Sequence, residues 1–111
     1  MASFEPGDGI KVPFPYVDRP TRQSRPALVV SLPALEERHG LLWVVMITSA
    51  ENRNWPGDVA VDDLVVAGLP AASVVRTAKI ATIEARDAQR LGRIAVDPMQ
   101  VIGRHLAAAL G

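Results

Sequence analysis

Arg25 is the first residue whose type and position could do chemistry. It stands directly before Pro26, where a polar loop rich in Pro and Arg meets the apolar run of residues 27–30. A guanidinium at the mouth of a rigid strand is well placed to hold a phosphate, because its planar fork of N–H donors matches two phosphate oxygens at once. Composition alone favours a simpler interpretation, an exposed arginine that ends a loop.

Two hydroxyl side chains, Thr48 and Ser49, follow the apolar run of residues 41–47. A hydroxyl at a strand end can donate to a phosphate oxygen or orient an attacking group. Ser and Thr also begin ordinary turns. By themselves the two residues therefore decide nothing.

Trp55 stands beside two turn residues, Pro56 and Gly57. If it is exposed, its ring could stack on a base, as aromatic side chains do in single-stranded nucleic-acid binders. If it folds back, it would cover the core. The chain has only five aromatic residues, which slightly favours the core position.

Metal and thiol chemistry have little support in the sequence. The absence of Cys excludes disulfides, thiolate metal sites and cysteine nucleophiles. His39 and His105 are far apart in the chain, and neither has a carboxylate at metal-ligand spacing. We predict no metal site and no cofactor, and we expect both histidines at the surface.

Composition limits the class of protein. The chain has 111 residues, of which 49% are hydrophobic, and its 12 basic and 12 acidic residues give zero net charge. We expect one domain over residues 1–111. Zero charge argues against a general nucleic-acid coat protein, although residues 19–25 hold three arginines and no acid. The longest apolar run, residues 41–47, is far too short to span a membrane, so we expect a soluble, cytoplasmic protein without a membrane contact.

Most of the expected elements are strands. The second should be buried on both faces, the third should be central, and Pro13 places the first at an edge or near its own end. A polar loop over residues 15–23 and a turn over residues 68–70 should connect strands. Strands at this spacing predict a mainly β fold, a small barrel. The predicted strands are residues 10–14, 27–30, 41–48, 59–61, 73–76 and 79–83.

The carboxyl end has helical signals over residues 98–110. Asp97 can cap a helix, Pro98 suits its first position, and Gln100 stands where a capping-box side chain reaches back. We expect an amphipathic helix packed on the barrel. Its apolar stripe would comprise Val101, Ile102, Leu106, Ala109 and Leu110.

Eight sequence blocks cover nearly the whole chain in a particular order and spacing. The two most specific are PGD at 6–8 and SRPALVVS at 24–31. The others are VPFPY at 12–16, MITS at 46–49, WPGDV at 55–59, SVVR at 73–76, KIATIE at 79–84 and RLGRI at 90–94. Together they resemble the PemK/MazF family of bacterial toxins.

The resemblance implies an SH3-like barrel with added helices, a homodimer, and a cognate antitoxin that holds the toxin inactive. It also implies an endoribonuclease that cuts single-stranded RNA, usually messenger RNA, at short sequences without a metal. The family's usual catalytic residues correspond to Arg25 and Thr48, with Ser49 as a further hydroxyl. Residues expected to contact RNA are Arg19, Arg22, Trp55 and Arg76.

The sequence departs from the family pattern in its proton acceptor. Some relatives place a carboxylate two positions after the arginine that corresponds to Arg76, but Thr77 and Ala78 follow it here. Some relatives supply a histidine from the loop between the first two strands, and residues 17–24 contain none. The general base is therefore left open.

Metal-free cleavage of RNA can use the substrate's own 2′-hydroxyl as nucleophile, so that the protein need only align groups and stabilise charge. Arg25 would then stabilise the phosphoryl oxygens, and Thr48 would hold the phosphate or the 2′-hydroxyl. Two alternatives stay open. One is a toxin on the same barrel that poisons DNA gyrase, and the other is a nuclease-dead module that binds RNA or protein.

Overall fold

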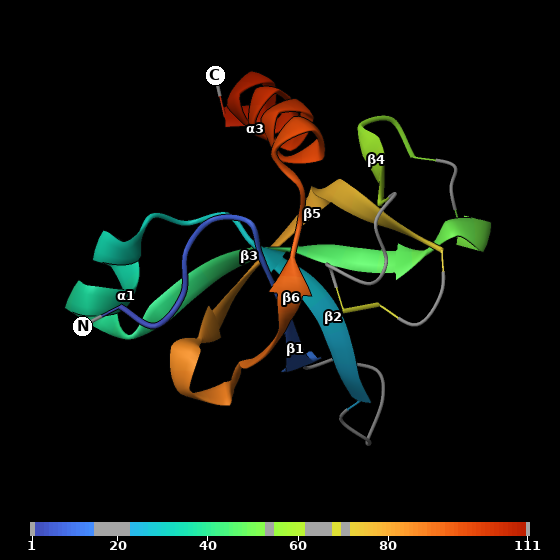
Figure 1. Ribbon diagram of the computed structural model, residues 1–111. Helices are drawn as coiled ribbons and strands as arrows, with labels where there is room; N and C mark the ends of the chain where they lie inside the picture. The colour runs from blue at the N-terminus through green and yellow to red at the C-terminus, as the bar shows by residue number, and fades with distance from the viewer. Residues whose placement is uncertain (1, 15–22, 53–54, 62–67, 70–71, 111) are drawn as a thin grey trace.

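In the part of the chain that the structure describes, a six-stranded antiparallel sheet curls into a half-barrel, with one long helix beside it (Figure 1). The computed structural model describes residues 2–14, 23–52, 55–61, 68–69 and 72–110. The strands lie in the order β4-β5-β3-β2-β1-β6, which confirms the predicted mainly β barrel with a C-terminal helix. The elements are β1 (Asp8–Phe14), β2 (Gln23–Val29), α1 (Pro33–His39), β3 (Leu41–Ser49), η1 (Ala50–Asn52), β4 (Asp58–Val61), β5 (Ser73–Glu84), η2 (Ala85–Asp87), β6 (Gln89–Arg93) and α3 (Val96–Leu110).

The middle of the sheet is formed by the strands predicted to be most buried. β3 pairs with β2 on one side and β5 on the other, so it is central as predicted. In β2, Ala27, Leu28 and Val29 have no exposed surface, which confirms burial on both faces. Pro13 lies near the end of β1, beyond Lys11, the last residue that pairs with β6.

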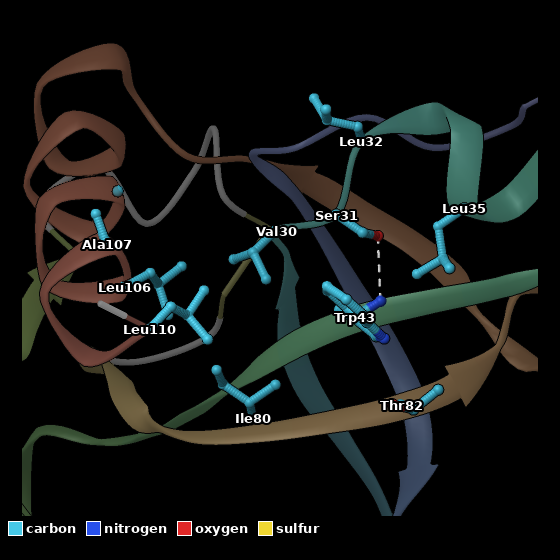
Figure 2. A pocket seen from close by; sticks show the side chains of 11 residues that line it. Val30, Ser31, Leu32, Leu35, Trp43, Ile80, Thr82, Leu106, Ala107 and Leu110 are labelled. Atoms are coloured by element: carbon cyan, nitrogen blue, oxygen red, sulfur yellow. Dashed lines mark hydrogen bonds between the residues drawn. The ribbon is translucent and has the colours of Figure 1, made fainter.

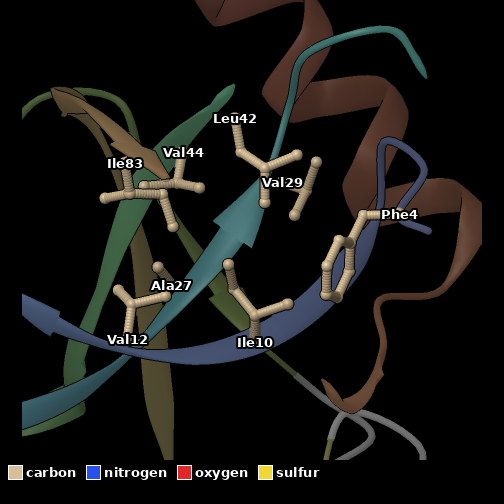
Figure 3. Close-up of a cluster of buried hydrophobic side chains, with 8 residues drawn as sticks. All are labelled: Phe4, Ile10, Val12, Ala27, Val29, Leu42, Val44 and Ile83. Carbon is tan, nitrogen blue, oxygen red and sulfur yellow. The ribbon is translucent and has the colours of Figure 1, made fainter. Parts of the chain in front are cut away.

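Each face of the sheet carries its own apolar cluster. On one face, side chains from β1, β2 and β3 gather with Phe4 at one end (Figure 3). On the other face, Leu28, Val45 and Val75 pack against Ile102 of α3. Because a strand sends alternate side chains to opposite faces, β2 and β3 contribute to both clusters. These strands are therefore rigid supports for whatever polar side chains stand at their ends.

β5 is one strand, not the two that were predicted. Val45 pairs with Ile80, whereas the next residue, Met46, pairs with Arg76, so residues 77–79 form a bulge within β5. A bulge interrupts the alternation of side chains without ending the strand. The sequence pattern over residues 73–83 therefore resembles two short strands.

Neither α1 nor β6 was predicted. α1 has Pro33 at its start and Gly40 in the left-handed conformation at its end, but none of its residues is buried, so it has no apolar stripe. β6 also has no buried residue. Pairing with β1 places it in the sheet, and this long-range contact leaves no local pattern.

α3 begins at Val96, two residues before the predicted start, and the Met99 N–H donates to the Ala95 carbonyl 3.2 Å away. Asp97 is therefore a residue within the helix and not its N-cap. The Asp97 side chain is not among those that the structure describes. The predicted stripe is only partly correct, because Ile102 is fully buried while Leu110 is 76% exposed.

Candidate functional site

β2 and β3 bring Arg25 and Thr48 to the same end of the sheet. The two strands pair from Val29–Val44 to Ala27–Met46, and Arg25 and Thr48 each lie two residues beyond this ladder, at the same end of their strands. An arginine side chain is long, so its guanidinium can reach toward a group that the Thr48 hydroxyl also contacts. Both residues are half-buried.

The face that carries Arg25 and Thr48 is apolar at one end and polar at the other. Alternation along the strands places both side chains on the face of Ala27 and Val44, which belong to the cluster in Figure 3. Thr48 also pairs with Val74 of β5, which has no exposed surface. The polar end is thus an extension of a packed core.

Ser49 is separated from this pair. It follows Thr48 in the strand, so its side chain points to the opposite face. It is exposed, and its Oγ accepts a hydrogen bond of 3.3 Å from the Glu51 backbone N–H at the start of η1. In this structure Ser49 is the last residue of β3, and its hydroxyl binds the backbone of the η1 helix that follows.

Arg76 is buried and ion-paired, although sequence analysis suggested an RNA contact. Its Nε donates to Oδ1 of Asp58 at 3.2 Å, and its Nη2 donates to Oδ2 at 3.0 Å. The two side chains are 9% and 4% exposed. Such a bidentate pair fixes both groups and leaves neither charge uncompensated. Sequence analysis gave Asp58 no role, because β4 and β5 are joined across 11 intervening residues.

Trp55 is not in the core, contrary to the favoured prediction. The residue is 41% exposed. The guanidinium carbon of Arg76 lies 4.4 Å from the ring centre, and Nζ of Lys79 lies 5.3 Å from it. These are cation–π distances. Trp55 and Arg76, which were both predicted to contact RNA, therefore lie together.

The turn that precedes β4 is tied to the sheet and to α3. The Gly57 carbonyl accepts a hydrogen bond from Oγ1 of Thr77 at 2.9 Å, and Nδ1 of His105 lies 3.1 Å from the same oxygen. Because a carbonyl only accepts, Nδ1 of His105 is the donor. Gly57 has φ +88, and a Cβ there would lie 2.8 Å from Thr77 Oγ1. His105 is thus half-buried and bonded, not the surface histidine that was expected.

A second charged cluster explains the PGD block. Asp8 has no exposed surface; its Oδ1 lies 2.7 Å from Nη1 of Arg93 and its Oδ2 lies 3.0 Å from Nη1 of Arg90. Oδ2 also accepts a hydrogen bond of 2.9 Å from the Glu5 backbone N–H. This carboxylate joins β1 to β6, so its role is structural.

An apolar groove of about 750 Å³ lies between α3 and the sheet. In Figure 2, Trp43 lies between the loop of Leu32 and the strand of Ile80, and Leu106 and Leu110 face it from α3. The Trp43 backbone N–H donates to Oγ of Ser31 at 3.1 Å. Trp43 is 49% exposed, and Leu32 and Leu110 are more exposed still. The groove lies apart from Arg25 and Thr48.

Arg19 and Arg22 lie outside the described residues. Within the described part of the chain, no group of three or more His, Cys, Asp or Glu residues is placed to hold a metal ion. None of the helices in that part is long and apolar enough to cross a membrane.

The sequence of this chain matches one known protein family over almost its whole length. Residues 5–110 match the family described as the PemK-like, MazF-like toxin of type II toxin-antitoxin systems. The chain belongs to this family. No curated protein sequence matches it.

Solved MazF structures share the fold of this PemK/MazF-type chain. A MazF from Deinococcus radiodurans superposes with a TM-score of 0.79 at 22% identity, covering 100% of this chain and 98% of its own. A MazE–MazF structure from the same organism gives 0.76 at 22% identity, covering 100% and 97%. An endoribonuclease from a mycobacterial species, in complex with its cognate antitoxin, gives 0.75 at 23% identity, covering 100% and 96%. At these identities the likeness shows the fold.

Proposed function

We propose that this PemK/MazF-type toxin is an endoribonuclease that cuts single-stranded RNA, chiefly messenger RNA, at short sequences. The observation that supports the proposal is that Arg25 and Thr48 lie at the same end of two paired strands, each two residues beyond the Ala27–Met46 pair. A similar fold in a mycobacterial endoribonuclease supports the same activity.

The reaction needs no external nucleophile. The 2′-oxygen of the substrate attacks the adjacent phosphorus, the new O–P bond closes a 2′,3′-cyclic phosphate, and the bond from phosphorus to the 5′-oxygen breaks. The 2′-hydroxyl loses its proton, and the leaving 5′-oxygen gains one. No water is consumed in this step.

Arg25 stabilises the negative charge on the phosphoryl oxygens through two parallel N–H donors, because the planar guanidinium binds two oxygens of an anion at once. Thr48 donates to the same phosphate or holds the 2′-hydroxyl in line. Ser49 takes part only if the strand end rearranges. Neither guanidinium nor hydroxyl is a group that activates water, which favours attack by the substrate itself.

The assembly follows from the same proposal. Residues 1–111 act as one toxin domain in the cytoplasm, as a homodimer that a cognate antitoxin holds inactive. The apolar groove beside Trp43 and Leu110 is the face that a second copy would cover, because exposed apolar surface of this extent commonly marks an interface. Arg19 and Arg22 bind the RNA backbone.

The test uses purified protein, a long single-stranded RNA and excess chelator. We expect discrete fragments that end in a 2′,3′-cyclic phosphate on one side of the cut and a 5′-hydroxyl on the other. Replacing the ribose before the scissile bond by deoxyribose should stop cutting at that bond while binding persists. Cutting of the deoxy-substituted strand, or dependence on added Mg²⁺, contradicts the mechanism. A complete lack of cutting favours the gyrase-poisoning or nuclease-dead alternatives.

A further inference from the structure

The position of Trp55 has no explanation in the packing of the core. The residue is 41% exposed, and the guanidinium carbon of Arg76 lies 4.4 Å from the ring centre. Exposed aromatic rings held by a cation offer a surface on which another planar group can stack.

Arg76 cannot turn away from Trp55 without breaking its ion pair. Both carboxylate oxygens of Asp58 accept hydrogen bonds from its guanidinium, and both side chains are nearly buried. The pair is neutral as a whole, so Arg76 is a support for the ring more than a ligand for phosphate. This gives a positioning role to a residue that sequence analysis placed in direct contact with RNA.

The turn that carries the ring is also fixed at its backbone. The Asp58 N–H donates to the Trp55 carbonyl at 3.2 Å, and the Gly57 carbonyl is bonded from β5 and α3 by Thr77 and His105. Trp55 is therefore preorganised, and little conformational freedom would be lost when a ligand stacks on it.

The ring stands close to the proposed cleavage site. Arg76 follows Val74, the partner of Thr48, by two residues on the same face of β5. Strand geometry puts the backbone of Arg76 roughly 8 Å from that of Thr48, a distance that neighbouring nucleotides of one strand can span. A strand whose phosphate lies between Arg25 and Thr48 would present a flanking base to Trp55.

We propose that Trp55, supported by the Asp58–Arg76 pair, is the stacking platform for one nucleobase beside the scissile phosphate, and that Lys79 binds the phosphate of that nucleotide. Lys79 is exposed, and its Nζ lies 5.3 Å from the same ring. Its flexible stem allows the ammonium to move from the ring to a phosphate oxygen. The proposal rests on the RNA substrate of the proposed function.

Fluorescence tests the platform directly, because the chain has only two tryptophans. Trp43→Phe leaves Trp55 as the sole tryptophan, whose emission can be excited selectively over that of Tyr16. The probe is a short single-stranded RNA that carries deoxyribose before the scissile bond, and the anisotropy of a dye on its end reports binding independently. We expect Trp55 emission to be quenched in step with binding. Unchanged emission at saturating RNA overturns the platform.

Kinetics test the energetic contribution of the ring. Trp55→Ala should raise KM for RNA by about 5- to 100-fold, as expected for the loss of one base stack, with little change in kcat. Trp55→Phe should recover KM to within about threefold, because it keeps an aromatic face. Asp58→Asn weakens the ion pair that holds Arg76 against the ring, so it should raise KM for RNA. The same variant should reduce the quenching of Trp55 emission by bound RNA. An unchanged KM for Trp55→Ala contradicts the proposal.

Lys79 has a matched control, since the only other lysine of the chain is Lys11. Lys11 is also exposed, but it lies on β1. It precedes Val12, so its side chain points to the face of the sheet opposite to that of Val12. Acetylation followed by mass spectrometry should show that the deoxy-substituted RNA protects Lys79 and leaves Lys11 reactive. Lys79→Ala should reduce the slope of log affinity against log salt by about one, whereas Lys11→Ala should not. Equal protection of both lysines overturns the assignment of Lys79.

Failure of the platform and failure of the proposed function give different results. If the parent protein neither binds nor cuts RNA, the proposed function is wrong. If the parent protein cuts RNA while Trp55 emission and the KM of Trp55→Ala stay unchanged, the platform alone is wrong. The fluorescence arm retains Trp55, so it remains decisive even if Trp55→Ala does not fold.

Discussion

At the scale of single residues, function depends on which side chains the strand register brings together. Arg25 and Thr48 are 23 positions apart, yet the antiparallel pairing of β2 with β3 brings them to the same end of the two strands. Thr48 and Ser49 are neighbours in sequence, yet alternation sends them to opposite faces. The catalytic proposal therefore predicts unequal effects of mutating two adjacent hydroxyls.

Arg25→Ala should lower the cleavage rate by about a hundredfold or more, as expected for loss of a principal donor to the phosphoryl oxygens. Arg25→Lys should recover little of this, because an ammonium keeps the charge but loses the planar fork. The measurement is the single-turnover rate on a defined RNA, with the urea midpoint as a check on folding. A variant that unfolds, or one that cuts as fast as the parent, removes Arg25 from this role.

Thr48→Val deletes the hydroxyl while keeping a β-branched side chain of similar shape. We expect kcat to fall by roughly tenfold or more, since one hydrogen bond made in the transition state is worth about 1.4 kcal/mol. Ser49→Ala is the matched control and should stay within about twofold of the parent. Normal activity of Thr48→Val, or an equal loss in both variants, counts against the assignment.

At the scale of elements, the sequence predicted the buried strands and not the partners that determine the site. The apolar runs that became β2 and β3 were recognisable, because burial on both faces leaves continuous hydrophobic residues. The Asp58–Arg76 pair was not recognisable, because a contact between strands so far apart in sequence leaves no local sequence pattern. Trp55 was assigned to the core for the same reason, since its support by Arg76 depends on that pairing.

Asp8 provides a test of how β1 and β6 are held together. Asp8→Ala removes a buried carboxylate from two arginines and one backbone N–H, and we expect a loss of about 2–4 kcal/mol in the free energy of unfolding. Urea denaturation measures it. Glu84→Gln is the control: its partner Arg86 and Glu84 itself are at least half exposed, so the loss should stay below about 1 kcal/mol. Equal losses would mean that the Asp8 cluster contributes little.

At the scale of the whole molecule, the two proposed surfaces lie on different parts of the fold. Residues 73–76 of β5 belong to the half that carries the proposed RNA site, whereas Ile80 and Thr82 line the apolar groove. The bulge at residues 77–79 separates the two halves. Dimerisation through the groove would therefore leave the face of Arg25 and Thr48 accessible to RNA.

Leu110→Glu places a charge in the apolar groove at a position that is 76% exposed, so folding should be preserved. We expect the protein to sediment as a dimer at micromolar concentration and the variant to shift toward the monomer. Ala108→Glu is the control, because this residue is exposed on the same helix but does not line the groove. A monomeric parent, or an equal effect of both variants, removes the groove as the dimer face.

The link between Asp8 and Arg93 has a consequence for synthesis of the chain. These residues are 85 positions apart, and β6 follows the other five strands of the sheet in the chain. Folds dominated by such distant contacts form late, because the long loop must close before the contact stabilises it. A nascent chain that has not yet been extended past β6 therefore lacks one edge strand of the sheet. We expect the toxin to become active only after translation has passed β6, which leaves an interval in which an antitoxin made alongside can already be present.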